Sequence, residues 1–232
     1  AMGLGLGFQE GEGPYFERPL HSEKSILGLS VPDPEQSLRY VLDATRLIHH
    51  ELKDKVPLIG FCGSPWTMAC YMVEGKANKS FPKIHALRNE NPHLLHHLLN
   101  VLALSVVEHL SAQIKAGVEV VKIFDTWGGM LQKEDYQTFS LHYAEKIISA
   151  LKARHPEVPI ILFTKGGGQW LDIMAKTGCN VLGVDWTTSL HNARSQVGQQ
   201  VALQGNMNPE MLYQSPEMIE QDVARILKEF GS

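Results

Sequence analysis

Short apolar runs alternate with longer amphipathic segments along most of the chain. After residue 33, each apolar run is followed by a segment whose apolar residues recur every three to four positions, as in a helix. This alternation favours β-α-β units arranged around a parallel sheet. The pattern predicts five strands, at residues 57–61, 118–124, 159–164, 181–184 and 201–204.

The expected helices have recognisable ends. One helix is predicted from residue 33 to about residue 50, because Asp33 suits the N-cap and Pro34 the first helical position. Its buried stripe is expected to consist of Leu38, Val41, Leu42 and Ile48. Further helices are predicted at residues 91–116, 133–155 and 215–230.

The first 32 residues differ from the rest of the chain. Gly3, Gly5 and Gly7 are followed by the segment 11–14, which reads GEGP, so a helix or a long strand is not expected. We interpret residues 1–32 as a loop or flap, with room for a sixth strand near residues 4–8. No linker divides the chain, so residues 1–232 are predicted to form one domain. Five or six strands fit either an open sheet or part of an eight-stranded barrel, and both chain ends are expected to be cut.

The composition narrows the classes of function. The 232 residues include 21 Lys and Arg against 25 Asp and Glu, a formal net charge of −4, and 44% of them are hydrophobic. This is typical of a soluble globular protein, and without a surplus of cations nucleic-acid binding is not expected. The most apolar segment, residues 94–110, contains histidine, asparagine and glutamate, so we expect a core helix and no membrane span.

The cysteines indicate a reducing compartment. Cys62, Cys70 and Cys179 form no C-x-x-C pair and have no histidine at metal-ligand spacing. We therefore expect reduced, mostly buried thiols and no bound metal. The N-terminal residues show no basic segment followed by an apolar one, so no signal peptide is expected and the cytoplasm is the predicted location.

Polar or glycine-rich residues follow every predicted strand, at the edge where parallel α/β folds build their sites. Lys165 follows the third strand. It can form a Schiff base if it is desolvated, although a solvated or carboxylate-paired lysine is the more ordinary interpretation. Asp185 follows the fourth strand. It is predicted to be a structural carboxylate that accepts hydrogen bonds from loop amides, and a catalytic role is the alternative.

Several of these strand-end segments form one family pattern. The motifs are GSPWT at 63–67, YMVEG at 71–75, FDTWGG at 124–129, GVDWT at 183–187 and LQGNMNP at 203–209. In order and spacing they resemble the uroporphyrinogen decarboxylase family, over essentially the whole chain. The resemblance implies a (β/α)₈ barrel, here an incomplete barrel with five to six parallel strands, and a homodimer.

The resemblance also implies an activity. Family members are carboxy-lyases that need no cofactor and convert the four acetate side chains of uroporphyrinogen III to methyl groups, giving coproporphyrinogen III in haem biosynthesis. Their catalytic aspartate lies in an S-D-I-L motif, expected before Ala1. An R-Q-A-G-R-Y segment lies further upstream and a G-H-G loop downstream. None of these motifs occurs in the 232 residues, so the chain alone is expected to be inactive.

Two substrate contacts are carried over from the resemblance. Tyr71 resembles the family tyrosine whose hydroxyl lies beside the reacting acetate, and Thr126 resembles a Ser or Thr that binds a substrate carboxylate. The alternative for Tyr71 is an aromatic with a backbone partner, and for Thr126 a turn hydroxyl. Phe124 and Trp127 are expected either to line the apolar floor of a macrocycle pocket or to pack in the core.

Two other functions stay open at this point. The first is a methyltransferase of the related barrel superfamily, which generally uses zinc held by histidine and cysteine. The second is a non-catalytic binding fragment.

Overall fold

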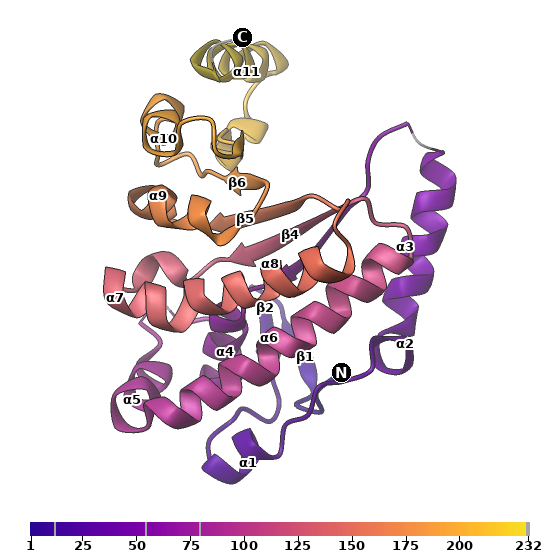
Figure 1. The fold of residues 1–232 in the computed structure, drawn as a ribbon, viewed down its shortest axis with the longest axis vertical. Helices are drawn as coiled ribbons and strands as arrows, with labels where there is room; N and C mark the ends of the chain where they lie inside the picture. The colour runs from indigo at the N-terminus through magenta and orange to yellow at the C-terminus, as the bar shows by residue number, and fades with distance from the viewer. Residues whose placement is uncertain (12, 54, 79, 231–232) are drawn as a thin grey trace.

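The computed structural model describes residues 1–11, 13–53, 55–78 and 80–230 (Figure 1). Residue 12 of the glycine-rich opening and the last two residues lie outside the described residues. The central element is a parallel sheet whose strands pair in sequence order. Its strands are β3 (Ile59–Gly63), β4 (Val120–Asp125), β5 (Ile160–Thr164), β6 (Val181–Gly183) and β7 (Ala202–Gln204).

All five predicted strands are confirmed, with boundaries that differ by at most two residues. Each strand is parallel to the next one in the chain, which is the strand progression of a β/α barrel. The described sheet is therefore an incomplete barrel of the expected α/β class.

Helices fill the connections between the strands. The α-helices are α1 (Glu23–Leu27), α2 (Pro34–Ser37), α3 (Arg39–Leu52), α4 (Pro65–Glu74), α5 (Pro82–Glu90), α6 (Pro92–Lys115), α7 (Lys133–Asp135), α8 (His142–Arg154), α9 (Leu171–Met174), α10 (Leu190–Val197) and α11 (Pro216–Phe230). The 3₁₀ turns are η1 (Gly128–Met130), η3 (Gly167–Trp170), η4 (Ala175–Thr177) and η5 (Pro209–Tyr213), while η2 (Tyr136–Leu141) is a π-helical segment. The helix predicted at residues 133–155 is thus α7, η2 and α8 in succession.

The core lies between the sheet and the helices α4, α6 and α8, and Figure 1 shows α6 and α8 crossing one face of the sheet. Val121 and Ile123 of β4 are buried on this covered face, against α6. By length and apolar composition α6 would qualify as a membrane span, contrary to the expectation from its polar residues. Most of its leucines are nevertheless buried against α4, α8 and the sheet, so we interpret α6 as a core helix.

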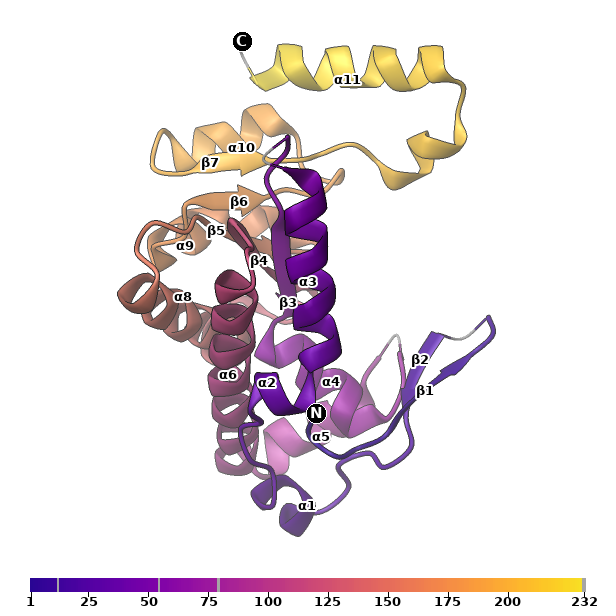
Figure 2. The same ribbon diagram turned by 90° about the vertical axis from the view of Figure 1, so that its right-hand side faces the viewer.

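The N-terminal segment forms a separate hairpin. The strands β1 (Leu6–Gln9) and β2 (Gly13–Phe16) pair with each other in antiparallel fashion. Figure 2 shows the hairpin projecting from the body of the molecule. Gly11 and Gly13 reverse the chain with positive φ angles of 76° and 88°, which glycine adopts without strain. The strand expected near residues 4–8 therefore exists, but it lies outside the parallel sheet.

The helix predicted from residue 33 to residue 50 is broken. Asp33 caps α2 as predicted and accepts a hydrogen bond of 2.9 Å from the backbone of Glu35. Leu38, with φ −131° and ψ 23°, then leaves the helical region and separates α2 from α3. The predicted stripe is wrong for Ile48, which is 48% exposed, whereas Leu42 is fully buried. The reason is that α3 packs mainly against α2 and α6, so its far end has little to bury against.

Candidate functional site

The predicted substrate contact Phe124 lies on the face of the sheet opposite to α6, which we call the inner face. Residues of β4 alternate between the buried covered face and this half-buried inner face. The Phe124 ring meets the rings of Phe61 and Phe163 edge to face, with centroids 5.7 Å and 5.6 Å apart. Three neighbouring strands thus contribute one aromatic row, and Phe124 is at its centre.

Tyr71 and Thr126 lie on neighbouring segments at the end of β4. Thr126 is the first residue after the strand and is half-buried. Tyr71, on α4, packs its ring against Trp127 and Phe81, with centroids 6.2 Å and 6.3 Å away. Within the part of the chain that the structure describes, the Tyr71 hydroxyl has no hydrogen-bond partner. The structure therefore brings Tyr71 beside the β4 turn and leaves its hydroxyl available to a ligand.

Trp127 belongs partly to the core. Its ring packs edge to face on Phe81 at 4.8 Å, and it is half-buried against the main hydrophobic cluster. Its backbone carbonyl accepts a hydrogen bond of 3.2 Å from the indole of Trp66. Core packing thus accounts for its position next to Thr126.

A buried carboxylate, Asp125, fixes this arrangement. Its side chain is 1% exposed and accepts hydrogen bonds from the hydroxyls of Ser64 at 2.6 Å, Thr67 at 3.0 Å and Ser140 at 2.6 Å. Ser64 is the N-cap of α4, the helix that carries Tyr71, and Ser140 lies in η2. Asp125 therefore ties the end of β4 to α4 and to η2.

Two effects act on the charge of Asp125. Burial raises the pKa of the Asp125 carboxyl, while the three hydroxyls and the backbone amide of Gly128 oppose that rise by stabilising the ionised form. Sequence reasoning did not single out Asp125. The alternation of β4 contains the signal, because a period of two places Asp125 on the same buried face as Val121 and Ile123.

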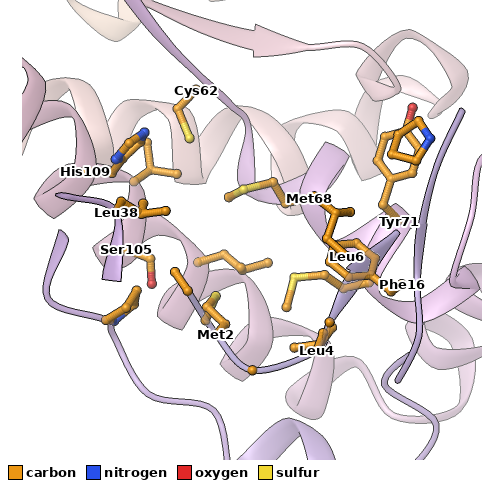
Figure 3. Close-up of a pocket in the computed structure, with 18 of the residues that line it drawn as sticks. Met2, Leu4, Leu6, Phe16, Leu38, Cys62, Met68, Tyr71, Ser105 and His109 are labelled. Carbon is orange, nitrogen blue, oxygen red and sulfur yellow. The ribbon is translucent and has the colours of Figure 1, made fainter. Parts of the chain in front are cut away.

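An apolar cavity of about 520 Å³ lies next to these residues, between the N-terminal segment, β3, α4 and α6. Figure 3 shows Tyr71 at one end of it and His109 with Cys62 at the other, while Met2 and Leu4 line the space between. Its lining is mostly hydrocarbon, so it is suited to an apolar group.

His109 takes part in a chain of hydrogen bonds that ends on β3. Its Nε2 lies 2.8 Å from Nε2 of Gln113, whose amide also donates to the carbonyl of Phe61 and accepts from the Phe61 N–H, both at 3.1 Å. Because the Gln113 nitrogen is a donor, the imidazole nitrogen must be an acceptor. Burial lowers the pKa of His109, which agrees with this neutral form.

The weaker candidates take ordinary positions. Lys165 is exposed, with its ammonium 5.9 Å from the centre of the Trp186 ring, so it lacks the desolvation that a Schiff-base lysine needs. Asp185 is buried and accepts hydrogen bonds from the backbone amides of Gly166 and Thr187 and from the Thr187 hydroxyl. The predicted hydrogen bonds from loop amides to Asp185 are confirmed.

All three cysteines are free thiols, as expected. Cys70 and Cys179 are buried and Cys62 is half-buried. Burial raises the pKa of the Cys62 thiol to about 12, so it is not a reactive thiolate. Among the residues that the structure describes, no group of three His, Cys, Asp or Glu side chains is placed to hold a metal ion.

Comparisons with known proteins agree with the motifs. The family model described as uroporphyrinogen decarboxylase (URO-D) matches residues 1–232. Curated relatives named uroporphyrinogen decarboxylase include those of Nitrosococcus oceani, Hydrogenovibrio crunogenus and Photorhabdus laumondii, at 54%, 55% and 56% identity. Each alignment covers 100% of this chain and 66% of the relative, so the chain spans just under two thirds of the length of these proteins.

The fold has a close structural counterpart. A methyltransferase from Methanosarcina mazei superposes with a TM-score of 0.83 over 99% of this chain and 67% of that one, at 21% sequence identity. At this identity the likeness shows the fold alone.

Proposed function

Because the chain belongs to the uroporphyrinogen decarboxylase family, we propose that it supplies the porphyrinogen-binding part of a decarboxylase in porphyrin biosynthesis. The substrate is uroporphyrinogen III, whose four acetate side chains become the methyl groups of coproporphyrinogen III. The observation that carries the proposal is the identity of 54–56% to proteins of that name along the entire chain.

The reaction needs an electron sink, and the substrate contains one. A proton adds to the pyrrole carbon next to the acetate-bearing carbon. The bond to the carboxylate then breaks, its electron pair moves into the protonated ring, and CO₂ leaves. A second proton adds to the resulting methylene while the ring proton is lost, so each acetate consumes one proton and releases one CO₂. We therefore propose a carboxy-lyase that is independent of a cofactor.

The described residues have roles that suit this chemistry. The free hydroxyl of Tyr71 donates to the carboxylate of the reacting acetate, and the Thr126 hydroxyl holds a second carboxylate. A hydroxyl can donate in this way without adding charge to the site. Phe124 supplies an apolar surface for the macrocycle. The catalytic aspartate is the one that the family resemblance places in an S-D-I-L motif, which the sequence lacks.

The proposal predicts that this chain binds porphyrins but does not decarboxylate them. Binding is measured by quenching of tryptophan fluorescence with uroporphyrin, and turnover by an anaerobic assay with uroporphyrinogen. Tyr71→Phe and Thr126→Val are expected to weaken binding by about two- to tenfold each, the value of one hydrogen bond. The exposed residues Tyr213 and Thr138 provide matched controls as Tyr213→Phe and Thr138→Val, which should bind normally.

Two outcomes would count against the proposal. If the unaltered chain does not bind uroporphyrin, it does not supply the binding part. If the chain turns uroporphyrinogen over, the catalytic aspartate has been assigned to the wrong place.

The other functions are less well supported. A methyltransferase shares the fold, but the relatives at about 55% identity carry the decarboxylase name. Stoichiometric zinc in the purified protein would favour the methyltransferase. Binding of uroporphyrin that neither Tyr71→Phe nor Thr126→Val weakens would favour a binding fragment without the proposed site. From the family resemblance we also propose a cytoplasmic homodimer, which sedimentation velocity tests for the chain in solution.

A further inference from the structure

Lys122 lies in the middle of β4, on the inner face, two residues before Phe124. Its ammonium nitrogen is 4.6 Å from the centre of the Phe124 ring and 5.2 Å from that of Phe163. It donates a hydrogen bond of 2.8 Å to the side-chain oxygen of Gln204, at the end of β7. The side chain thus extends across the sheet and places a cation on the aromatic row.

Among the described residues, the charge of Lys122 has no counter-ion. Across the described ranges, no carboxylate lies within ion-pair distance of its ammonium. Lys122 is half-buried, so its ammonium has lost part of its hydration, and this burial lowers the pKa of Lys122. An ammonium has three N–H donors, of which Gln204 accepts one, and the ring faces attract the charge without accepting a full hydrogen bond. Donor capacity is therefore left for an anion.

We propose that Lys122 is a carboxylate-binding residue for the porphyrin macrocycle, whose ring lies against Phe61, Phe124 and Phe163. The assignment rests on the proposed function and adds a charged contact to it. The macrocycle carries eight carboxylates, whereas the chain has a net charge of −4, so cations must be supplied locally. Gln204 fixes the ammonium over the rings, and the partial loss of hydration strengthens its attraction for a carboxylate.

The chain offers a matched control for this lysine. Lys146 on α8 has its ammonium 5.3 Å from the centre of the Tyr143 ring and 3.4 Å from the side-chain oxygen of Asn100. It therefore makes the same two kinds of contact, but at an exposed position of a helix away from the inner face. Replacing either lysine by methionine removes a cation–π contact and an amide hydrogen bond, so Lys146→Met controls for the loss of these two kinds of contact.

The test compares Lys122→Met, Lys122→Arg and Lys146→Met in the full 232-residue chain. Each is titrated with uroporphyrin, which has eight carboxylates, and with mesoporphyrin, which has two. Lys122→Met is expected to weaken uroporphyrin binding by about tenfold at low salt, and mesoporphyrin binding less. Lys122→Arg keeps the charge and is expected to restore most of the affinity, while Lys146→Met is expected to bind as the unaltered chain does. Raising the salt concentration should weaken uroporphyrin binding by the unaltered chain more than binding by Lys122→Met.

The outcomes separate this assignment from the proposed function. If Lys122→Met binds uroporphyrin with normal affinity, the assignment of Lys122 is overturned. It is also overturned if Lys122→Arg loses as much affinity as Lys122→Met. Neither result affects the proposed function. If the unaltered chain binds neither porphyrin, both proposals fail. Far-UV circular dichroism and thermal melting check that each variant is folded. If Lys122→Met melts below the assay temperature, Lys122→Gln replaces it, with the same expected loss.

Discussion

Replacing Asp125 by alanine removes the acceptor that joins β4, α4 and η2. Three buried hydroxyls, those of Ser64, Thr67 and Ser140, lose their partner. Leaving one buried donor unsatisfied costs about 1–3 kcal/mol. The Ser64 and Thr67 hydroxyl oxygens still accept from the backbone N–H groups of Thr67 and Trp127, but their O–H groups are left without an acceptor. The sum is reduced because the desolvated carboxylate is itself removed. We expect Asp125→Ala to lower the free energy of unfolding by about 3–5 kcal/mol, as for other broken buried charge networks.

Asp125→Asn provides a graded comparison. The amide oxygen can still accept from Ser64 and Thr67, and the Ser140 hydroxyl can reverse and accept from the amide nitrogen. The expected loss is therefore smaller, about 1–2 kcal/mol. The exposed Asp172, replaced by asparagine, serves as the control and should change stability by less than about 0.5 kcal/mol.

Urea unfolding, followed by tryptophan fluorescence and circular dichroism, measures these differences as shifts of the midpoint at constant slope. A domain of this size is stable by only about 5–15 kcal/mol, so the loss in Asp125→Ala is a large share of the total. A value for Asp125→Ala within about 1 kcal/mol of the unaltered chain would refute the reasoning, because it would mean that the carboxylate network contributes no more than an ordinary surface group.

Burial lowers the pKa of His109 below 6.5, so His109 binds a proton more readily in the unfolded chain than in the folded one. The free energy of unfolding should therefore fall as the pH drops through 6.5. His109→Gln should reduce that fall, measured by urea unfolding from about pH 7 to pH 5. Leu99→Ala, at a fully buried position of α6, should cost about 2–5 kcal/mol in the same assay, whereas Leu104→Ala, where the leucine is 49% exposed, should cost less than about 1 kcal/mol. A Cβ atom at Gly129 would lie 2.0 Å from the carbonyl oxygen of Lys165, so Gly129→Ala should strain the β4 and β5 loops by about 1–3 kcal/mol and weaken uroporphyrin binding in a fluorescence titration.

The strands were predictable because each is short, apolar and bounded by polar residues. The break at Leu38 was not, because no glycine or proline lies between residues 35 and 51 to mark it. Leucine is a good helix former, so only the surroundings of α2 and α3 set its backbone angles. The exposure of Ile48 has the same origin: an apolar stripe shows which side of a helix is apolar, but not how far along that side a neighbour extends.

The candidate site was predicted only in part. Tyr71, Thr126 and Phe124 came from motifs, and their positions around the end of β4 agree with the rule that parallel sheets build sites at that edge. Gln204, by contrast, is 82 residues from Lys122. No local pattern joins the two, because their contact depends on the strand order from β4 to β7.

The two charged residues of β4 show how a structural charge differs from a binding one. Asp125 points to the covered face, and three hydroxyls and an amide of the chain itself satisfy its carboxylate. Lys122 points to the inner face, where the chain provides one amide oxygen and two aromatic rings. Burying a charge is costly unless it is compensated, and the compensation of Lys122 is incomplete. The same strand thus holds one charge that folding satisfies and one that an anionic ligand would satisfy. Variants of Asp125 should therefore change the stability of the chain, and variants of Lys122 should change its affinity for the porphyrin.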